Sequence, residues 1–147
     1  MYRKILACVD GSPPSLRAAR QAVGLARLSG AVLVLFYAVP PLAPYAAATG
    51  EEVALAQSLL TREMVSWGEE ILQRVRAELG EYAEGLDIRQ SVAVGPPGRA
   101  ILKELAEGGY DLVVVGSRGL GEWEGLLLGS VSNKVAHQAP CPVLIVR

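Results

Sequence analysis

A short run of glycine and polar residues has the composition of a phosphate-binding loop. Gly116, Ser117, Arg118 and Gly119 follow one another, and nine residues later the chain reaches Gly129 and Ser130. An apolar run precedes this stretch and a helical pattern follows it, which predicts a crossover from strand to helix. Glycine lets backbone approach a ligand closely, and Ser130 is expected to cap the next helix, whose first N–H groups attract anions. The alternative is a surface loop whose glycines only turn the chain.

Two common phosphate-binding motifs are absent. The P-loop pattern G-x-x-x-x-G-K-[ST] is excluded because no lysine precedes Ser130. The dinucleotide pattern G-x-G-x-x-G is excluded because Gly119 and Gly121 are followed by Glu124, where the third glycine would stand. Any phosphate site here is therefore of another type.

The composition indicates one globular domain over residues 1–147. The chain is 51% hydrophobic and 20% charged, with a net charge of −1. Because it has no basic arm, it lacks the electrostatic footprint of a nucleic-acid-binding protein. No apolar run approaches the roughly 18 residues of a membrane-spanning helix, and we see no signal peptide. We expect a cytoplasmic protein with no nucleic-acid and no membrane partner.

Few residues are suited to catalysis. His137 is the only histidine, and it falls within the expected last helix, where we expect it to face solvent or the sheet edge. Cys8 and Cys141 read as reduced thiols, and with one histidine they do not form a metal site. Asp10, at the end of the first strand, is the better candidate for orienting a water molecule or Mg²⁺.

Strands and helices are expected to alternate along the chain. Five apolar runs predict strands, at residues 5–9, 31–37, 86–94, 112–115 and 143–146. Helices are expected between them, with Ser12 as the cap before Pro13 and Gly30 as the end of the first helix. Residues 40–50 read as a loop rich in alanine and proline. The order β-α-β-α-β-α-β-α-β predicts an α/β fold: an open parallel sheet with helices on both faces.

The second helix is expected to be long and amphipathic, from Glu51 to about Leu79. Apolar residues recur every three or four positions: Val53, Ala56, Leu60, Met64, Trp67, Ile71, Val75 and Leu79. Large apolar residues at this period usually pack inside, so we expect Met64 and Trp67 to belong to the core. The charged residues between them are expected to face solvent.

In a sheet of this kind, ligands bind beyond the carboxyl ends of the strands, where the strand order reverses. Asp10 follows the first strand and Gly116 follows the fourth. If those strands are neighbours, Asp10 and the glycine loop face one crevice. The spacing by itself leaves that adjacency open.

The motifs resemble those of the universal stress protein family, in its nucleotide-binding branch. Gly116, Gly119, Gly129 and Ser130 fit the family pattern G-x2-G-x9-G-[ST] without gaps. The segments 9–12, 129–135 and 139–144 are similar to the family's N-terminal and C-terminal signatures. The resemblance runs the whole length and implies an open five-stranded sheet in the order 3-2-1-4-5.

The resemblance also implies ATP, with Mg²⁺, as the ligand of the crevice. By position, the backbones of Cys8 and Val39 would edge the adenine, Asp10 would lie near the ribose or the metal, and Gly116 would meet the ribose. Ser12 and Ser117 belong to the same motifs and are counted with the site. The residues expected to line the phosphates are Arg118, Gly119, Gly129, Ser130, Val131 and Ser132.

Family members of this type form homodimers through the last strand, here residues 143–146, which would otherwise leave an unpaired sheet edge. Two departures from the family stand out. Glu122, Trp123 and Glu124 replace small or basic residues, and Ala38 stands where histidine is frequent. Two carboxylates would repel a triphosphate unless a cation intervenes or they point to solvent.

These features lead to three hypotheses. The first is an ATP-binding, stress-related regulatory homodimer, whose nucleotide state is read by an unknown protein partner. The second is a slow ATPase or self-phosphorylating enzyme that uses the same site. The third is a nucleotide-free dimerisation module with purely structural glycines.

Overall fold

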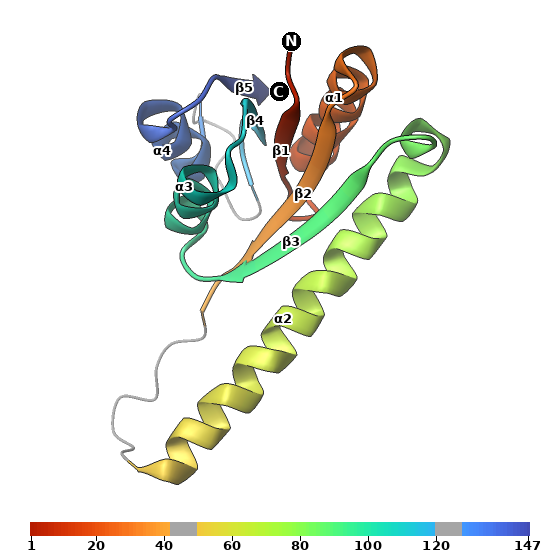
Figure 1. The fold of residues 1–147 in the computed structure, drawn as a ribbon. Helices are drawn as coiled ribbons and strands as arrows, with labels where there is room; N and C mark the ends of the chain where they lie inside the picture. Colours follow the sequence, from red (N-terminus) through yellow and green to blue (C-terminus); the bar gives the residue numbers. More distant parts are fainter. Residues whose placement is uncertain (42–49, 120–127) are drawn as a thin grey trace.

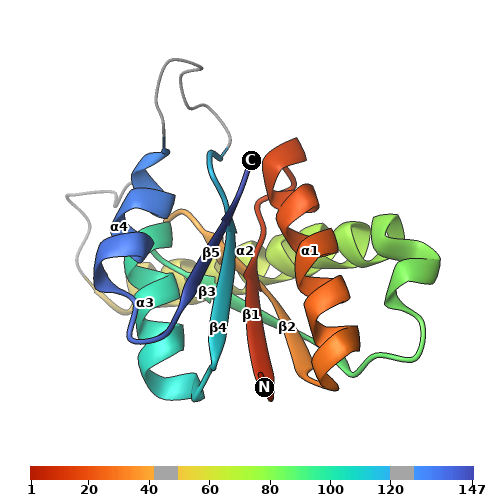
Figure 2. The same ribbon diagram turned by 90° about the horizontal axis from the view of Figure 1, so that it is seen from above.

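The protein forms three layers, with a parallel β-sheet between two pairs of helices (Figures 1 and 2). The computed structural model describes residues 1–41, 50–119 and 128–147. Within these ranges the elements are β1 (Lys4–Cys8), α1 (Pro13–Ser29), β2 (Val32–Val39), α2 (Glu51–Leu79), a 3₁₀ turn (Gly80–Ala83), β3 (Ile88–Val94), α3 (Pro97–Gly108), β4 (Leu112–Gly116), α4 (Ser130–Gln138) and β5 (Val143–Val146). The expected alternation of strands and helices is confirmed.

The sheet has the order β3-β2-β1-β4-β5, as expected, and each pair of neighbouring strands is parallel. Helices α1 and α2 contribute to one core cluster and α3 and α4 to the other, so the two pairs cover opposite faces (Figure 2). The central strands β1, β2 and β4 are continuous apolar runs because both of their faces are buried. In the part of the chain that the structure describes, no helix is long and apolar enough to cross a membrane.

The start and the end of α1 lie where the residue types predict them. Ser12 is the N-cap, its Oγ accepts a hydrogen bond from the Ser15 N–H, and proline occupies the first helical turn. Gly30 ends the helix in the left-handed conformation at φ 67°. Both predictions are confirmed.

The prediction that Trp67 lies in the core is wrong, because 48% of this residue is exposed. Met64 is partly buried, whereas Leu60 is 44% exposed. The face of α2 that meets the sheet is instead formed by Gly68, Leu72, Val75 and Leu79. A Cβ atom on Gly68 would come within 2.6 Å of Val92 Cγ1, so the missing side chain lets the helix approach β2 and β3 closely.

A carboxylate joins the amino-terminal ends of β1 and β4. Asp111 Oδ2 accepts hydrogen bonds from the backbone N–H groups of Arg3, at 2.8 Å, and Lys4, at 2.9 Å. These two bonds, with the positive charge of Arg3, hold the pKa of the Asp111 carboxyl below its usual value. The interaction therefore stabilises the fold only while Asp111 is ionised.

We expect Asp111→Ala to lower the melting temperature at neutral pH. A carboxyl whose pKa is lowered by folding contributes stability above its unfolded value, about 3.9, and loses that contribution as the pH falls through the lower folded value. The difference between the variant and the wild type should therefore shrink as the pH is lowered from 6 toward 3. Melting curves over that range test this, with the exposed Glu69→Gln as control. A difference that grows toward acid pH would contradict it.

Candidate functional site

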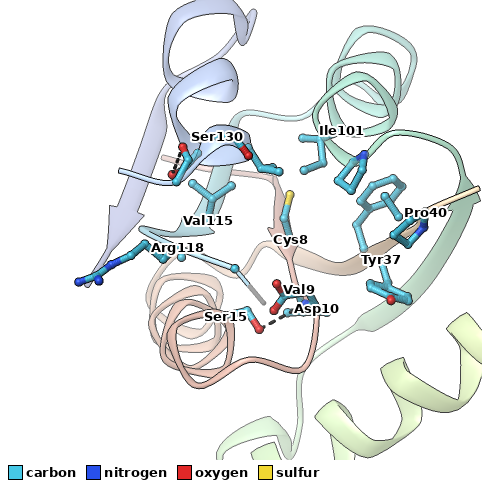
Figure 3. A pocket seen from close by; sticks show the side chains of 18 residues that line it. Cys8, Val9, Asp10, Ser15, Tyr37, Pro40, Ile101, Val115, Arg118 and Ser130 are labelled. Carbon is cyan, nitrogen blue, oxygen red and sulfur yellow. Dashed lines mark hydrogen bonds between the residues drawn. The ribbon is translucent and has the colours of Figure 1, made fainter. Parts of the chain in front are cut away.

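A cavity of about 330 Å³ opens beyond the carboxyl ends of the central strands (Figure 3). Its lining comes from the ends of β1, β2 and β4, from the residues just after these strands, and from the N-terminal turns of α1, α3 and α4. The lining residues are Cys8, Val9, Asp10, Ser15, Phe36, Tyr37, Ala38, Pro40, Pro97, Ile101, Val115, Gly116, Arg118, Gly119, Gly129, Ser130, Val131 and Ser132. Its volume is at the lower end of the range for small-molecule sites, about 300–1,000 Å³.

The cavity lies where the strand order reverses. Strands β1 and β4 are paired neighbours, with Cys8 opposite Val115. After β1 the chain continues into α1 on one face of the sheet, and after β4 it continues into α4 on the opposite face. The two connections therefore diverge and leave a crevice between them, as the strand-order rule requires. The residue spacing alone could not show that β1 and β4 are neighbours, and their pairing in the sheet now shows it.

Asp10 and Gly119 meet across this crevice. A Cβ atom built on Gly119 would lie only 2.7 Å from Asp10 Oδ2. The other oxygen, Oδ1, accepts a hydrogen bond of 2.9 Å from the Ser12 N–H, so the carboxylate is held by the turn that starts α1. Glycine at position 119 is therefore needed for the segment after β4 to lie against Asp10.

Gly116 serves a different close approach. A Cβ atom there would lie 2.9 Å from the Pro14 carbonyl carbon and 3.0 Å from the Ser15 nitrogen. Both are backbone atoms, which cannot move aside without displacing the first turn of α1. Gly116, which was expected to meet the ribose, thus lets β4 end directly against this helix.

The first turn of α4 is tied to the end of β4. Ser117 carries this connection through its backbone, because its carbonyl accepts hydrogen bonds from the Gly129 N–H, at 2.6 Å, and from Ser132 Oγ, at 2.8 Å. The Ser117 N–H in turn donates to the Val146 carbonyl of β5 at 2.7 Å. These bonds fix the direction in which α4 starts.

The prediction that Ser130 caps α4 is wrong. Ser130 is the first helical residue, the N-cap is Gly129, and among the described residues no side chain caps this helix. The physical reason is that Gly129 is already bound through its N–H to Ser117, which sets the helix start one residue earlier. Ser130, Val131 and Ser132 consequently line the cavity at the N-terminus of a helix, an arrangement suited to an anion.

Another part of the lining is apolar, and the thiol that borders it is unreactive. Phe36, Ala38, Pro40 and Ile101 come from β2, the residues after it, and α3. Cys8 is 9% exposed, and burial raises the pKa of its thiol, so it stays a neutral side chain that is unsuited to nucleophilic attack. Both cysteines are free of disulfides, as expected for reduced thiols.

Comparison with known proteins gives one consistent result. The family model described as "Universal stress protein family" matches residues 1–147. The chain belongs to the universal stress protein family. A universal stress protein of Thermus aquaticus is 37% identical over 148 residues, and YxiE of Bacillus subtilis is 33% identical over 161 residues. In both comparisons the match covers all of this chain and all of the relative.

A solved structure of the family adds a bound ligand. It is titled as a universal stress protein in complex with cAMP, and it is 32% identical to this chain with a TM-score of 0.65. The match covers 99% of this chain and 97% of that one. The nucleotide in that crystal is a property of the relative.

Most residues expected at the nucleotide site of this family member gather around the cavity. Cys8, Asp10, Gly116, Arg118, Gly119, Gly129, Ser130, Val131 and Ser132 all contribute to its lining. The Arg118 side chain points away from the centre of the cavity (Figure 3). That these residues contact a nucleotide stays a prediction.

Three expected residues lie outside the lining. Ser12 and Ser117 are 3% and 4% exposed and act through the hydrogen bonds described above. Val39 is 1% exposed and packs in the core on the α1 and α2 side, while its carbonyl accepts a hydrogen bond of 2.9 Å from the Gly95 N–H. Contact between the Val39 backbone and adenine stays a prediction.

The sequence did not point to Phe36, Tyr37, Pro40, Pro97 and Ile101. A usable signal was present, because each lies at or near a carboxyl strand end, or in the first two turns of the helix after β3. Residues at such positions border the crevice of an open parallel sheet. The unusual residues Glu122, Trp123 and Glu124 lie outside the described residues. His137 is exposed on α4, away from the lining, as expected.

Proposed function

We propose that this universal stress protein binds ATP with Mg²⁺ in the cavity between β1 and β4, and that it acts in the cytoplasm as a nucleotide-responsive regulatory homodimer. One observation carries the proposal: the N-terminus of α4, which no side chain of the described residues caps, and the Asp10 carboxylate border the same cavity. A helix N-terminus attracts phosphate, and a carboxylate beside it suits a bridging cation. The unpaired cysteines fit a reducing compartment.

The apolar part of the cavity supports a purine as the other half of the ligand. Ala38, Pro40 and Ile101 offer aliphatic surface to a flat ring, whereas Phe36, which also borders the cavity, is fully buried. The relative crystallised with cAMP, at 32% identity, carries an adenine nucleotide. An adenine nucleotide thus matches both ends of the cavity.

The position of Asp10 supports Mg²⁺ and a polyphosphate. A phosphate group near Gly119 would lie close to Asp10 Oδ2, since even a Cβ atom on Gly119 would be 2.7 Å from that oxygen. Two negative groups repel at this range unless a divalent cation lies between them. ATP carries several phosphate oxygens that can share such an ion with Asp10.

The lining supports binding in preference to rapid turnover. Among the described residues of the cavity, Asp10 is the only carboxylate, and histidine and lysine are absent. Fast phosphoryl transfer needs a group that positions the nucleophile together with groups that stabilise the transferred phosphoryl. We infer that occupancy of the site is the signal, and that a protein partner recognises it.

We expect a thermal shift with ATP and Mg²⁺ that exceeds the shift with GTP. At a ligand concentration of 100 times the dissociation constant, binding adds about 2.7 kcal/mol, or roughly 5–11 °C for a chain of this size. ADP and AMP measured alongside rank the contribution of each phosphate. An assay of ADP release on the same samples should stay at background. Equal melting temperatures with and without every nucleotide would contradict the proposal, and rapid ADP release would replace it with an ATPase.

The homodimer is proposed to form through β5 (Val143–Val146), whose outer edge pairs with no other described strand of the sheet. The carbonyl of Pro142 accepts a hydrogen bond from Val113 of β4, and that of Val146 accepts one from Ser117, just after β4. The alternate residues Val143 and Ile145 therefore direct their backbone groups outward. Pairing of this edge with a second copy would satisfy those groups.

We expect Ile145→Pro to abolish this dimer and Ile145→Ala to preserve it. Proline removes an outward N–H and leaves the bonds to β4 intact, whereas alanine removes the side chain and retains the N–H. Sedimentation velocity of the two variants separates backbone pairing from side-chain packing. Loss of the dimer in both variants, or in neither, would contradict pairing through this edge.

A further inference from the structure

A buried hydroxyl in the wall of the cavity makes no hydrogen bond to the described part of the chain. It belongs to Tyr37, which is 5% exposed and lines the cavity. Within residues 1–41, 50–119 and 128–147, no group forms a hydrogen bond with it. Buried hydroxyl groups are normally bonded, so an exception asks for an explanation. We therefore expect the Tyr37 hydroxyl to find its partner in a molecule bound in the cavity.

The ring that carries this hydroxyl is held from the side of α2. Trp67 packs edge-on against the Tyr37 ring, with 6.0 Å between the ring centres. Gly68 lies against the same ring, since a Cβ atom there would be 3.4 Å from Tyr37 Cδ1. These contacts restrict the ring before any ligand arrives. A restricted side chain loses little freedom on binding, which favours its use in recognition.

Tyr37 and Asp10 leave neighbouring strands at the same edge of the sheet. Cys8 lies opposite Phe36 in the β1–β2 pair, and the Val9 N–H donates to the Phe36 carbonyl at 2.9 Å. Tyr37 directly follows Phe36, and Asp10 directly follows Val9. Figure 3 shows both side chains on the same side of the cavity. Burial and the charge of Asp10 raise the pKa of the Tyr37 hydroxyl, so it stays protonated and can donate a hydrogen bond.

The position of Tyr37 is intermediate between the two ends of the cavity. Ala38 and Pro40, which follow it along the chain, belong to the apolar end. Asp10, beside it, meets Gly119 at the end that suits phosphate. A nucleotide with its base on the apolar surface and its phosphates at the start of α4 would pass its sugar between these ends. Tyr37 would then face the sugar.

The chemistry of the two side chains also suits a sugar hydroxyl. The Tyr37 hydroxyl donates a hydrogen bond, and the Asp10 carboxylate accepts one. A hydroxyl of the ligand can accept from the first while it donates to the second. A phosphate oxygen at the same place would only accept, and it would be repelled by the Asp10 charge unless a cation lay between them. A sugar hydroxyl is therefore the group that both side chains can bind directly.

We infer that Tyr37 recognises the sugar of the bound nucleotide, and that its hydroxyl donates a hydrogen bond to a ribose hydroxyl. This inference rests on the proposed function, because it assigns one residue to one part of the proposed ligand. It adds a selectivity for the sugar to the site. One neutral hydrogen bond changes affinity by roughly two- to tenfold.

Titration calorimetry with ATP, 2′-deoxy-ATP and 3′-deoxy-ATP, all with Mg²⁺, tests this inference. The wild type should bind ATP roughly two- to tenfold more tightly than the analogue that lacks the bonded hydroxyl. Tyr37→Phe should bind ATP as weakly as it binds that analogue, because the preference for the hydroxyl is lost. Tyr82→Phe is the matched control, since Tyr82 is a 70% exposed tyrosine in the 3₁₀ turn, and it should keep the wild-type preference.

Melting curves without nucleotide separate recognition from a structural role. Phenylalanine keeps the ring against Trp67 and removes only the hydroxyl, so Tyr37→Phe should melt at the wild-type temperature or higher. A lower melting temperature would show a bond within the protein and overturn the inference. The inference is also wrong if Tyr37→Phe keeps the wild-type preference, or if it binds all three nucleotides weakly by the same factor. A wild type that binds none of them would overturn the proposed function as well, which distinguishes the two failures.

Discussion

Gly119→Val should abolish the thermal shift that ATP produces and leave the protein folded. The first added carbon would lie 2.7 Å from Asp10 Oδ2, and the two methyl groups would add further bulk beside this carboxylate. Asp10 cannot turn away freely because its Oδ1 is bound to the Ser12 N–H. We expect ATP affinity to fall by about a hundredfold or more, since a loss of about 2.7 kcal/mol corresponds to that factor.

The matched control is Gly24→Val, measured by the same melting curves and by titration calorimetry. Gly24 lies on the exposed side of α1, and a Cβ atom there would meet nothing within 4 Å. This variant should bind ATP as the wild type does. Full ATP binding by Gly119→Val would leave the glycine with only a structural role, whereas a wild type that itself fails to bind ATP would favour the nucleotide-free dimerisation module.

Asp10→Asn should remove the dependence of ATP binding on Mg²⁺. The amide oxygen of asparagine can still accept the hydrogen bond from the Ser12 N–H, so the turn before α1 should persist. The variant loses the negative charge and the ligand oxygen that suit Mg²⁺. We expect affinity for ATP with Mg²⁺ to fall by about tenfold or more, and affinity for AMP without metal to stay equal or to rise because a repulsion is removed.

Asp87→Asn serves as the control for this loss of charge. Asp87 immediately precedes β3, at the amino-terminal end of the sheet, and pairs with Arg89 at 2.8 Å. Its replacement should leave the response to Mg²⁺ unchanged. If Asp10→Asn keeps both the wild-type affinity for ATP and the wild-type dependence on Mg²⁺, the carboxylate has no part in holding the cation. If it loses ADP release far more than binding, the site is catalytic.

The fold could be predicted from local patterns because its signals are local. Continuous apolar runs such as 112–115 mark strands buried on both faces, and their alternation with helices requires a parallel sheet. The ends of α1 followed from Ser12, Pro13 and Gly30, whose backbone preferences act within a few residues. The strand order could not be predicted from these local signals. It was predicted from the family resemblance, and the order of the sheet, with β1 paired to β4, confirmed it.

Predictions failed where two positions close in sequence compete for the same role. Periodicity described an apolar stripe on α2 but could not decide which side of it meets the sheet. Gly68 decides this, because its missing side chain allows a contact that turns Trp67 outward. Ser130 and Gly129 were likewise both suitable as the N-cap of α4, and the bond from Gly129 to Ser117 selected the glycine.

The sequence alone determined the α/β class, the extent of most elements and the set of residues around which an anion site could form. Only the tertiary structure decided that Asp10 meets Gly119, that Gly116 is small because α1 starts against it, and that Val39 packs into the core instead of lining the cavity. The physical reason is that propensity and periodicity act over a few residues. Close approach joins segments that are about a hundred residues apart in the chain, and steric exclusion fixes it only once the sheet has assembled.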